Sequence, residues 1–203
     1  MIVNLILLAV FMVVAFALWR QGAWATMLML LNILAAATLA TAWFETLVAM
    51  LEPVFPSYTY LLDFICIWAA FSLTLLVLRE VIEKVTPERV KLRKPVELFG
   101  TPLLAVIAAW IMVAFTATTL HVAPLPAGMV QPTPDSRMFL GLAPDRKWLQ
   151  WVRNSSRFGP FGRPDHAFDE GVVAEGAGGD FIIRYHERRK RLAAEEALRI
   201  YVP

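Results

Sequence analysis

Two carboxylates, Glu45 and Asp63, stand inside long apolar stretches of the sequence. An ionisable side chain within a membrane span is costly, so such a residue is a candidate functional group. Both residues fall near the ends of their stretches, where water or lipid headgroups can reach a carboxylate and the cost falls. We interpret them as interfacial polar residues. The alternative is a proton or cation site, formed where the two carboxylates face each other near one membrane surface.

A second polar group, Asn32, lies deeper in its apolar stretch, and Thr38 and Thr41 follow it. Amide and hydroxyl side chains in apolar helices commonly hydrogen-bond to a neighbouring helix. We therefore expect this set to join helices rather than to bind a substrate.

The residues that usually carry catalysis do not form a recognisable pattern. The sequence has one cysteine, Cys66, within an apolar run, where a thiol acts as a small hydrophobe. No histidine has the i,i+4 histidine or the neighbouring cysteine that a zinc site needs, and no Gly-x-Ser-x-Gly elbow occurs. Ser155 and Ser156 have no obvious base nearby in sequence. These observations favour a protein that is not an enzyme and has no cofactor.

Composition identifies the elements that must position these residues. The chain has 203 residues, of which 58% are hydrophobic and 18% charged, whereas soluble domains are about half apolar and a quarter charged. Apolar runs occupy residues 2–19, 23–50, 61–78 and 98–120, and a helix needs roughly 18 or more such residues to cross the hydrocarbon. The sequence predicts an all-α membrane protein with four transmembrane helices in residues 1–120, followed by a partly ordered soluble tail in residues 121–203.

The connections between the runs predict how the helices cross. Arg20, Gln21 and Gly22 are the whole first link, so the first two helices must be antiparallel, and the glycine allows the positive φ that a helix end often needs. Arg20 and the basic residues of the third connection fall on one side of the membrane, and basic loops are typically cytoplasmic. We therefore expect an inner-membrane protein with both termini outside the cytoplasm.

Small residues four apart, at Ala36 and Ala40 and again at Ala105 and Ala109, allow helices to approach closely. This spacing is typical of helix packing within a chain and of homo-oligomers, and it does not separate the two. The formal net charge of +2 is too small to indicate nucleic-acid binding.

The tail begins with a proline-rich stretch, residues 124–144, which predicts an extended linker. Residues 145–153 then read as a short amphipathic helix, with two alternatives: it lies on the membrane against anionic lipid, or it packs on the rest of the tail or on a partner. Residues 171–179 predict a loop, and residues 180–185 a short strand. Residues 186–200 predict a charged helix with a solvated face, and a partner-binding helix is the less favoured alternative.

Several short motifs resemble the colicin V production protein (CvpA) family. They are the Arg20–Gly22 link, residues 61–79, and the Lys-Pro-Val-Glu-Leu-Phe-Gly stretch that ends at Gly100. Residues 56–60, 118–121 and 180–185 are similar to a long-tailed subgroup of that family in planctomycete bacteria. The family often carries a second Arg-Gly within helix four; here only Gly100 matches, so no role of the missing arginine can be carried over.

The resemblance implies an inner-membrane protein used in envelope homeostasis and in toxin or peptide export, acting through helix–helix and partner contacts. The rival hypothesis is a channel or transporter subunit that conducts as an oligomer and uses Glu45, Asp63 and Asn32. The residues that we single out for function are Arg20, Gly22, Asn32, Glu45, Asp63 and Gly100.

The predicted orientation can be tested with a reporter fused to the C-terminus. A reporter that is active only in the cytoplasm should stay silent there, because the basic connections hold the other face inside. A periplasmic reporter at the same position is the matched control and should be active. A cytoplasmic signal from the C-terminal fusion would reverse the orientation.

Overall fold

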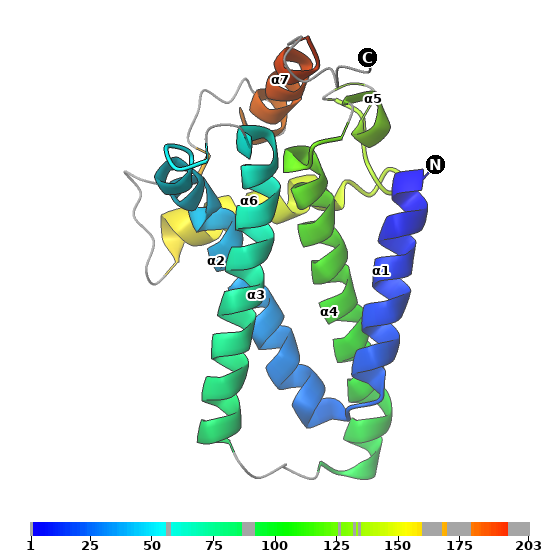
Figure 1. The fold of residues 1–203 in the computed structure, drawn as a ribbon. Helices are drawn as coiled ribbons and strands as arrows, with labels where there is room; N and C mark the ends of the chain where they lie inside the picture. The colour runs from blue at the N-terminus through cyan, green and yellow to red at the C-terminus, as the bar shows by residue number, and fades with distance from the viewer. Residues whose placement is uncertain are drawn as a thin grey trace, which may run out of the picture.

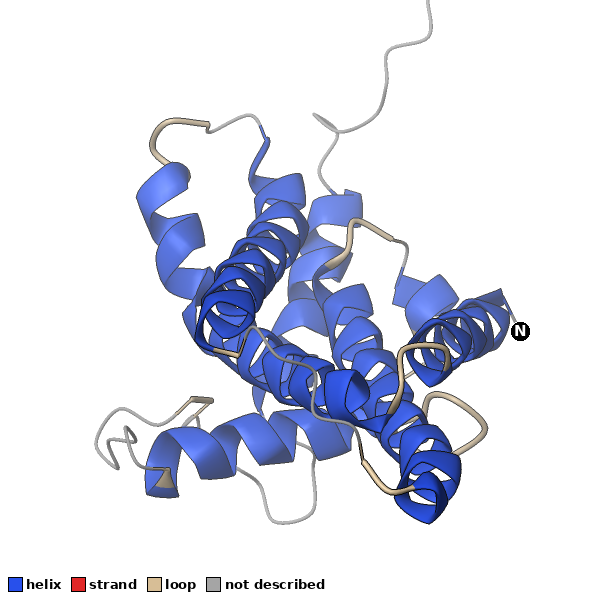
Figure 2. Ribbon diagram, turned by 90° about the horizontal axis from the view of Figure 1, so that it is seen from below, coloured by secondary structure: helices blue, strands red, loops and turns tan. Residues whose placement is uncertain are grey.

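The computed structural model describes residues 2–55, 58–86, 92–125, 127–131, 133, 135–159, 168–169 and 180–194. In this part of the chain every regular element is a helix (Figure 2). In chain order the elements are α1 Ile2–Trp19, α2 Ala23–Leu51, α3 Thr59–Val85, α4 Lys94–Val122, α5 Ala127–Val130, α6 Pro144–Phe158 and α7 Asp180–Ala194. The predicted all-α fold class is confirmed.

Helices α1 to α4 are long and apolar enough to cross a membrane, which confirms the four predicted spans. Helices α3 and α4 extend further into the third connection than their apolar runs do. In α3, Arg79 and Glu83 are one turn apart and form a 2.8 Å ion pair that supports the added turn. In α4, Pro95 stands in the first turn, where its missing N–H would have had no helical partner.

Helices α1 and α2 are antiparallel, as the short link requires, but they separate after the link and pair with other helices (Figure 1). Helix α1 packs along α4, where Leu7 shares a buried cluster with Val113 and Ala117. Helix α2 packs on both α3 and α4. Helix α4 therefore lies between the two halves of the bundle.

The alanines spaced by four lie at these internal contacts. Ala36 and Ala40 of α2 are buried in the cluster that α2 shares with α3, and Ala105 and Ala109 of α4 are buried as well. Their lack of side-chain bulk lets the helix backbones approach. In this chain the small-residue spacing thus serves packing within one molecule.

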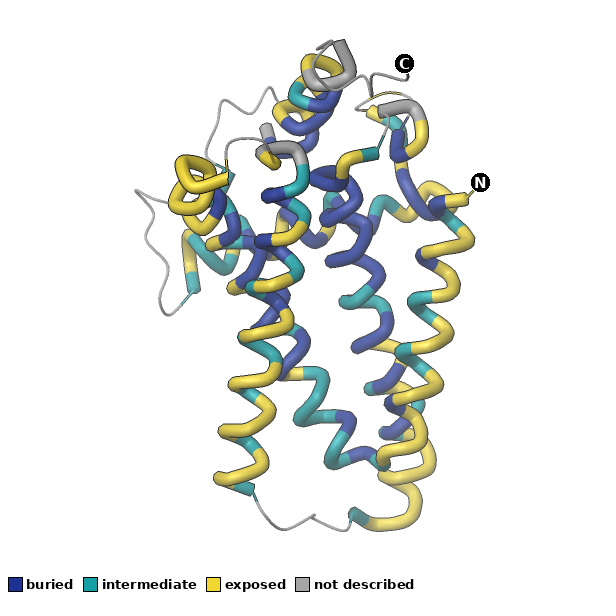
Figure 3. Tube along the Cα trace, viewed as in Figure 1, coloured by how far each residue is buried: buried dark blue, intermediate teal, exposed yellow. Residues whose placement is uncertain are grey.

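The bundle has two different ends, which we name by what they carry. The basic end contains Arg20, the end of α3 and the start of α4. The tail-bearing end contains the N-terminus, the end of α4 and helices α5, α6 and α7 (Figure 1). Burial is concentrated towards the tail-bearing end, while near the basic end α3 and the start of α4 are largely exposed (Figure 3). Apolar side chains exposed there suit contact with lipid.

The stretch predicted as an extended linker folds back on the bundle instead. It contains α5 and a turn at residues 138–142, and Met138 and Phe139 are buried in the cluster between α1 and α4. Phe139 packs against Trp110, with ring centroids 6.1 Å apart. Burial of these two apolar side chains holds the described part of this stretch against the bundle.

At the basic end, Gly22 permits a close junction of α1, α2 and α4. Its φ of 86° and ψ of 160° lie in a region that is essentially restricted to glycine. A Cβ on Gly22 would stand 2.8 Å from Glu97 Oε1, the oxygen that accepts from the Ala23 N–H at 3.4 Å. The Thr26 hydroxyl donates to Leu18 O at 2.9 Å and closes the link. The glycine predicted to allow a positive φ does so.

This junction gives a prediction with a built-in control. Gly22→Ala should destabilise the protein by about 1–3 kcal/mol, because alanine must adopt the strained backbone conformation. Gly100→Ala should be neutral or stabilising, because Gly100 is helical and an added Cβ would meet only ordinary contacts at 3.8 Å and 3.9 Å. The measurement is the apparent melting temperature in detergent. Equal losses in the two variants would contradict this account.

Candidate functional site

Glu45 of α2 and Asp63 of α3 lie together at the tail-bearing end. They line one pocket of about 220 Å³, so the structure brings together the two carboxylates that the sequence singled out. Only one of the two has the expected interfacial setting. Glu45 is partly exposed, whereas the Asp63 side chain is only 5% exposed. The expectation that water or headgroups reach both carboxylates is therefore wrong for Asp63.

Helix α7 covers the two carboxylates with two arginines. The guanidinium of Arg188 lies 2.8 Å from Asp63 Oδ2, and that of Arg184 lies 2.8 Å from Glu45 Oε1. The arginines are four residues apart, so they project from one face of the helix. We call this arrangement the α7 clamp: Arg184 and Arg188 on Glu45 and Asp63.

Tyr185 completes the clamp between the two arginines. Its hydroxyl donates to Glu45 Oε1 at 3.4 Å. Burial, and then the negative charges of Asp63 and Glu45, raise the pKa of the Tyr185 phenol well above its usual range. The phenol therefore stays protonated and remains a hydrogen-bond donor to the carboxylate.

An apolar face holds α7 against the bundle beside these charges. Phe181, Ile182 and Tyr185 are buried, and Phe44 of α2 packs edge-on against Phe181 with ring centroids 6.2 Å apart. The positions i, i+1 and i+4 make one stripe of a helix. The predicted strand at residues 180–185 is wrong, because this stripe finds a helical partner surface on α2.

The charged helix predicted for residues 186–200 is confirmed up to residue 194, and its solvated face carries Glu187 and Lys190. Its other face is buried against the bundle through His186 and Arg189. Glu187 and Arg191, which are spaced i,i+4, form an ion pair at 3.9 Å. The predicted loop at residues 171–179 and the predicted helical residues 195–200 lie outside the described residues.

Helix α6, the amphipathic helix of the tail, packs across the side of α4 and α2. Trp148 is buried, and its indole N–H donates to the Thr41 hydroxyl at 3.0 Å. Trp151 donates to the Thr38 hydroxyl at 3.1 Å. The predicted role of these threonines in joining helices is confirmed. The apolar face of α6 packs on the membrane helices of its own chain, an arrangement that neither of the two alternatives anticipated.

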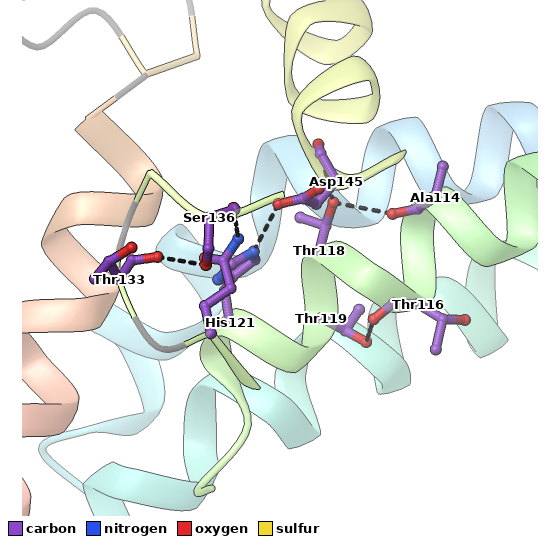
Figure 4. A network of polar contacts seen from close by, with 9 residues as sticks. Ala114, Thr116, Thr118, Thr119, His121, Thr133, Ser136 and Asp145 are labelled. Atoms are coloured by element: carbon purple, nitrogen blue, oxygen red, sulfur yellow. Dashed lines mark hydrogen bonds and ion pairs between the residues drawn. The ribbon is translucent and has the colours of Figure 1, made fainter. Parts of the chain in front are cut away.

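A buried pair that the sequence did not suggest joins α6 to α4. His121 Nε2 lies 3.0 Å from Asp145 Oδ2, and both side chains are fully buried (Figure 4). Thr118, one turn before His121, donates to Ala114 O at 3.0 Å and lies 3.5 Å from Asp145 O. Both side chains are withdrawn from solvent, so the pair has the geometry of a structural contact between the two helices.

The remaining predicted site residues lie towards the basic end. Arg20 and Asn32 line a separate pocket of about 450 Å³. Gly22 borders another of about 410 Å³, and Gly100 packs near Ala23. Asn32 is thus not part of the pocket that holds Glu45 and Asp63. Within the described ranges, no group of three or more His, Cys, Asp or Glu residues could hold a metal ion.

Comparisons with known proteins add no family assignment. No family model matches the chain, and the searches of curated proteins and of solved structures find no match either. What the structure establishes is a multi-pass, all-helical membrane architecture.

The two halves of the α7 clamp should differ in energy. Arg188→Gln leaves the Asp63 charge buried without its partner, which costs about 3–5 kcal/mol, and should release α7. Arg184→Gln breaks a pair that is largely exposed and should cost about 0–1 kcal/mol. Protease protection of α7 in detergent measures the release. Adding Asp63→Asn to Arg188→Gln should recover protection, since the buried charge is gone; no recovery would show that the charge is not the cause.

Proposed function

We propose that this chain is a non-enzymatic bacterial inner-membrane protein that acts through helix–helix and partner contacts in envelope homeostasis or in toxin and peptide secretion. The proposal takes its biological setting from the resemblance to the CvpA family, which short motifs carry. One observation above others supports the proposal that the protein acts through contacts. The α7 clamp attaches the tail to charged residues of the membrane helices.

The contacts of the polar side chains support a role without catalysis. Glu45 and Asp63 are bound by arginines of the same chain, and His121 is bound by Asp145 inside the core. Groups that could move protons or attack a substrate are thus engaged in holding the tail against the bundle. The membrane helices and the tail form one body that can present a surface to a partner.

The inner-membrane location and the orientation belong to the same proposal. Arg20 and the ends of α3 and α4 lie at one end of the bundle, and the tail lies at the other (Figure 1). If basic loops face the cytoplasm, α5, α6 and α7 lie outside it. A tail in that position would meet envelope components, which agrees with the proposed process.

A transporter subunit is the second candidate, because Glu45 and Asp63 line a common pocket at the membrane boundary. Under that hypothesis α7 would close the pocket and would have to move for ions to pass. Asn32, the third residue of the hypothesis, lines a different pocket. The carboxylates and the amide therefore do not share one binding site.

Two measurements separate the candidates. In proteoliposomes, the Glu45→Gln, Asp63→Asn double variant should show the same ion flux as the wild type, because the contact hypothesis gives these carboxylates no transport role. In cells that lack the endogenous copy, Arg188→Glu should fail to restore envelope resistance to detergent, and Arg188→Glu with Asp63→Arg should restore it. Flux that depends on the carboxylates would favour the transporter. Complementation by Arg188→Glu alone would refute the role of the clamp.

A further inference from the structure

The pocket of about 450 Å³ at the basic end lies between α2 and α3. The apolar cluster that joins these helices is built from residues nearer the tail-bearing end, such as Ala40, Phe44 and Ile67. Towards the basic end the two helices diverge (Figure 1). The space left between them is within the size range of small-molecule sites, about 300–1,000 Å³.

The lining of this pocket combines charged and apolar side chains. Its two cationic residues, Arg20 and Arg79, each follow directly after an apolar run of the sequence. The apolar residues include Trp24, Leu28 and Met29 on α2. Asn32, eight residues after Trp24, also lines the pocket, so the lining extends about 12 Å along the axis of α2. The pocket thus offers both a charged and an apolar surface to one ligand.

The charges of the pocket lining favour an anionic group. Arg20 and Arg79 carry two positive charges, and Glu83, which also lines the pocket, carries one negative charge. Arg79 donates its Nε to Glu83 at 2.8 Å, and a guanidinium has five N–H donors, so this bond orients the group and leaves donors to offer. A guanidinium group binds phosphate oxygens in charge-assisted hydrogen bonds.

We propose that this pocket binds an anionic phospholipid, with the headgroup phosphate between Arg20 and Arg79 and the start of an acyl chain against Leu28 and Met29. Basic pockets between transmembrane helices are suited to phospholipid headgroups. The apolar walls distinguish this occupant from a soluble phosphate, which would gain nothing from them. The occupant fills the gap between α2 and α3, which is otherwise an unpacked interface at the membrane surface.

The test uses the full chain purified in detergent and titrated with phosphatidylglycerol, with bound lipid counted by native mass spectrometry. Phosphatidylglycerol should bind in preference to phosphatidylcholine. The Arg20→Gln, Arg79→Gln double variant should lose affinity by at least about tenfold, since charge-assisted bonds are removed. Lys84→Gln is the matched control: it removes a positive charge from the exposed last turn of α3 without changing the pocket lining, and its affinity should be unchanged.

Two further variants separate the parts of the proposal. Leu28→Trp fills the apolar wall without changing charge and should weaken lipid binding, with the melting temperature as the check on folding. Glu83→Gln removes the negative charge of the pocket lining and should strengthen binding. The proposal is overturned if the arginine variant and Lys84→Gln lose affinity equally, or if soluble glycerol phosphate displaces the lipid at comparable concentration, which would show that the acyl chain is not recognised.

Discussion

A carboxylate buried at the end of an apolar bundle is the constraint around which the tail is organised. Asp63 is almost inaccessible to solvent, and an ionised group in such a place needs a partner of opposite charge. The partner is Arg188, which comes from the far end of the chain. Because Arg188 belongs to α7, the chain after α4 must return to the bundle. Helices α5, α6 and α7 belong to this returning segment.

The apolar contacts of the tail make this return stable. Ion pairs of buried groups contribute little net stability by themselves, because desolvation offsets the attraction. The stabilising contribution comes from burial of Phe181 and Tyr185 on Phe44 and of Trp148 on Phe115. The ion pairs and the His121–Asp145 contact then select one position for each helix, since other positions would leave a buried polar group without a partner. Tail and membrane helices therefore behave as one packed unit.

The sequence predicted the membrane helices well because lipid requires long uncharged runs. The apolar runs miss the last turns of α3 and the first turn of α4. The run in α3 stops before Arg79, whereas the helix continues past it, and the ion pair between Arg79 and Glu83 supports the added turn. The Gly22 conformation was also foreseen from the shortness of the link. These features depend on residues that are close in the sequence, where spacing and composition carry the information.

The tail was predicted poorly because its structure depends on distant partners. The Phe-Ile-Ile run at the start of α7 is short and apolar, and such a run is compatible with a strand or with a buried helix. What decides in favour of the helix is the surface of α2, which is more than 130 residues away in the chain. The pairing of His121 with Asp145 is likewise not encoded by any local spacing. Asp63 could be recognised as unusual, but its arginine could not.

The clamp and the lipid pocket are best treated as separate energetic units. Glu45 and Asn32 are thirteen residues apart on α2, which corresponds to about 20 Å along the helix. Residues at such a separation with no shared partner usually contribute independently to stability. A continuous helix does not by itself transmit a signal between two sites, because coupling needs an element with two discrete arrangements that both sites bias. The described contacts of helix α7 are with the tail-bearing end, so a lipid at the basic end does not contact the element that the clamp holds.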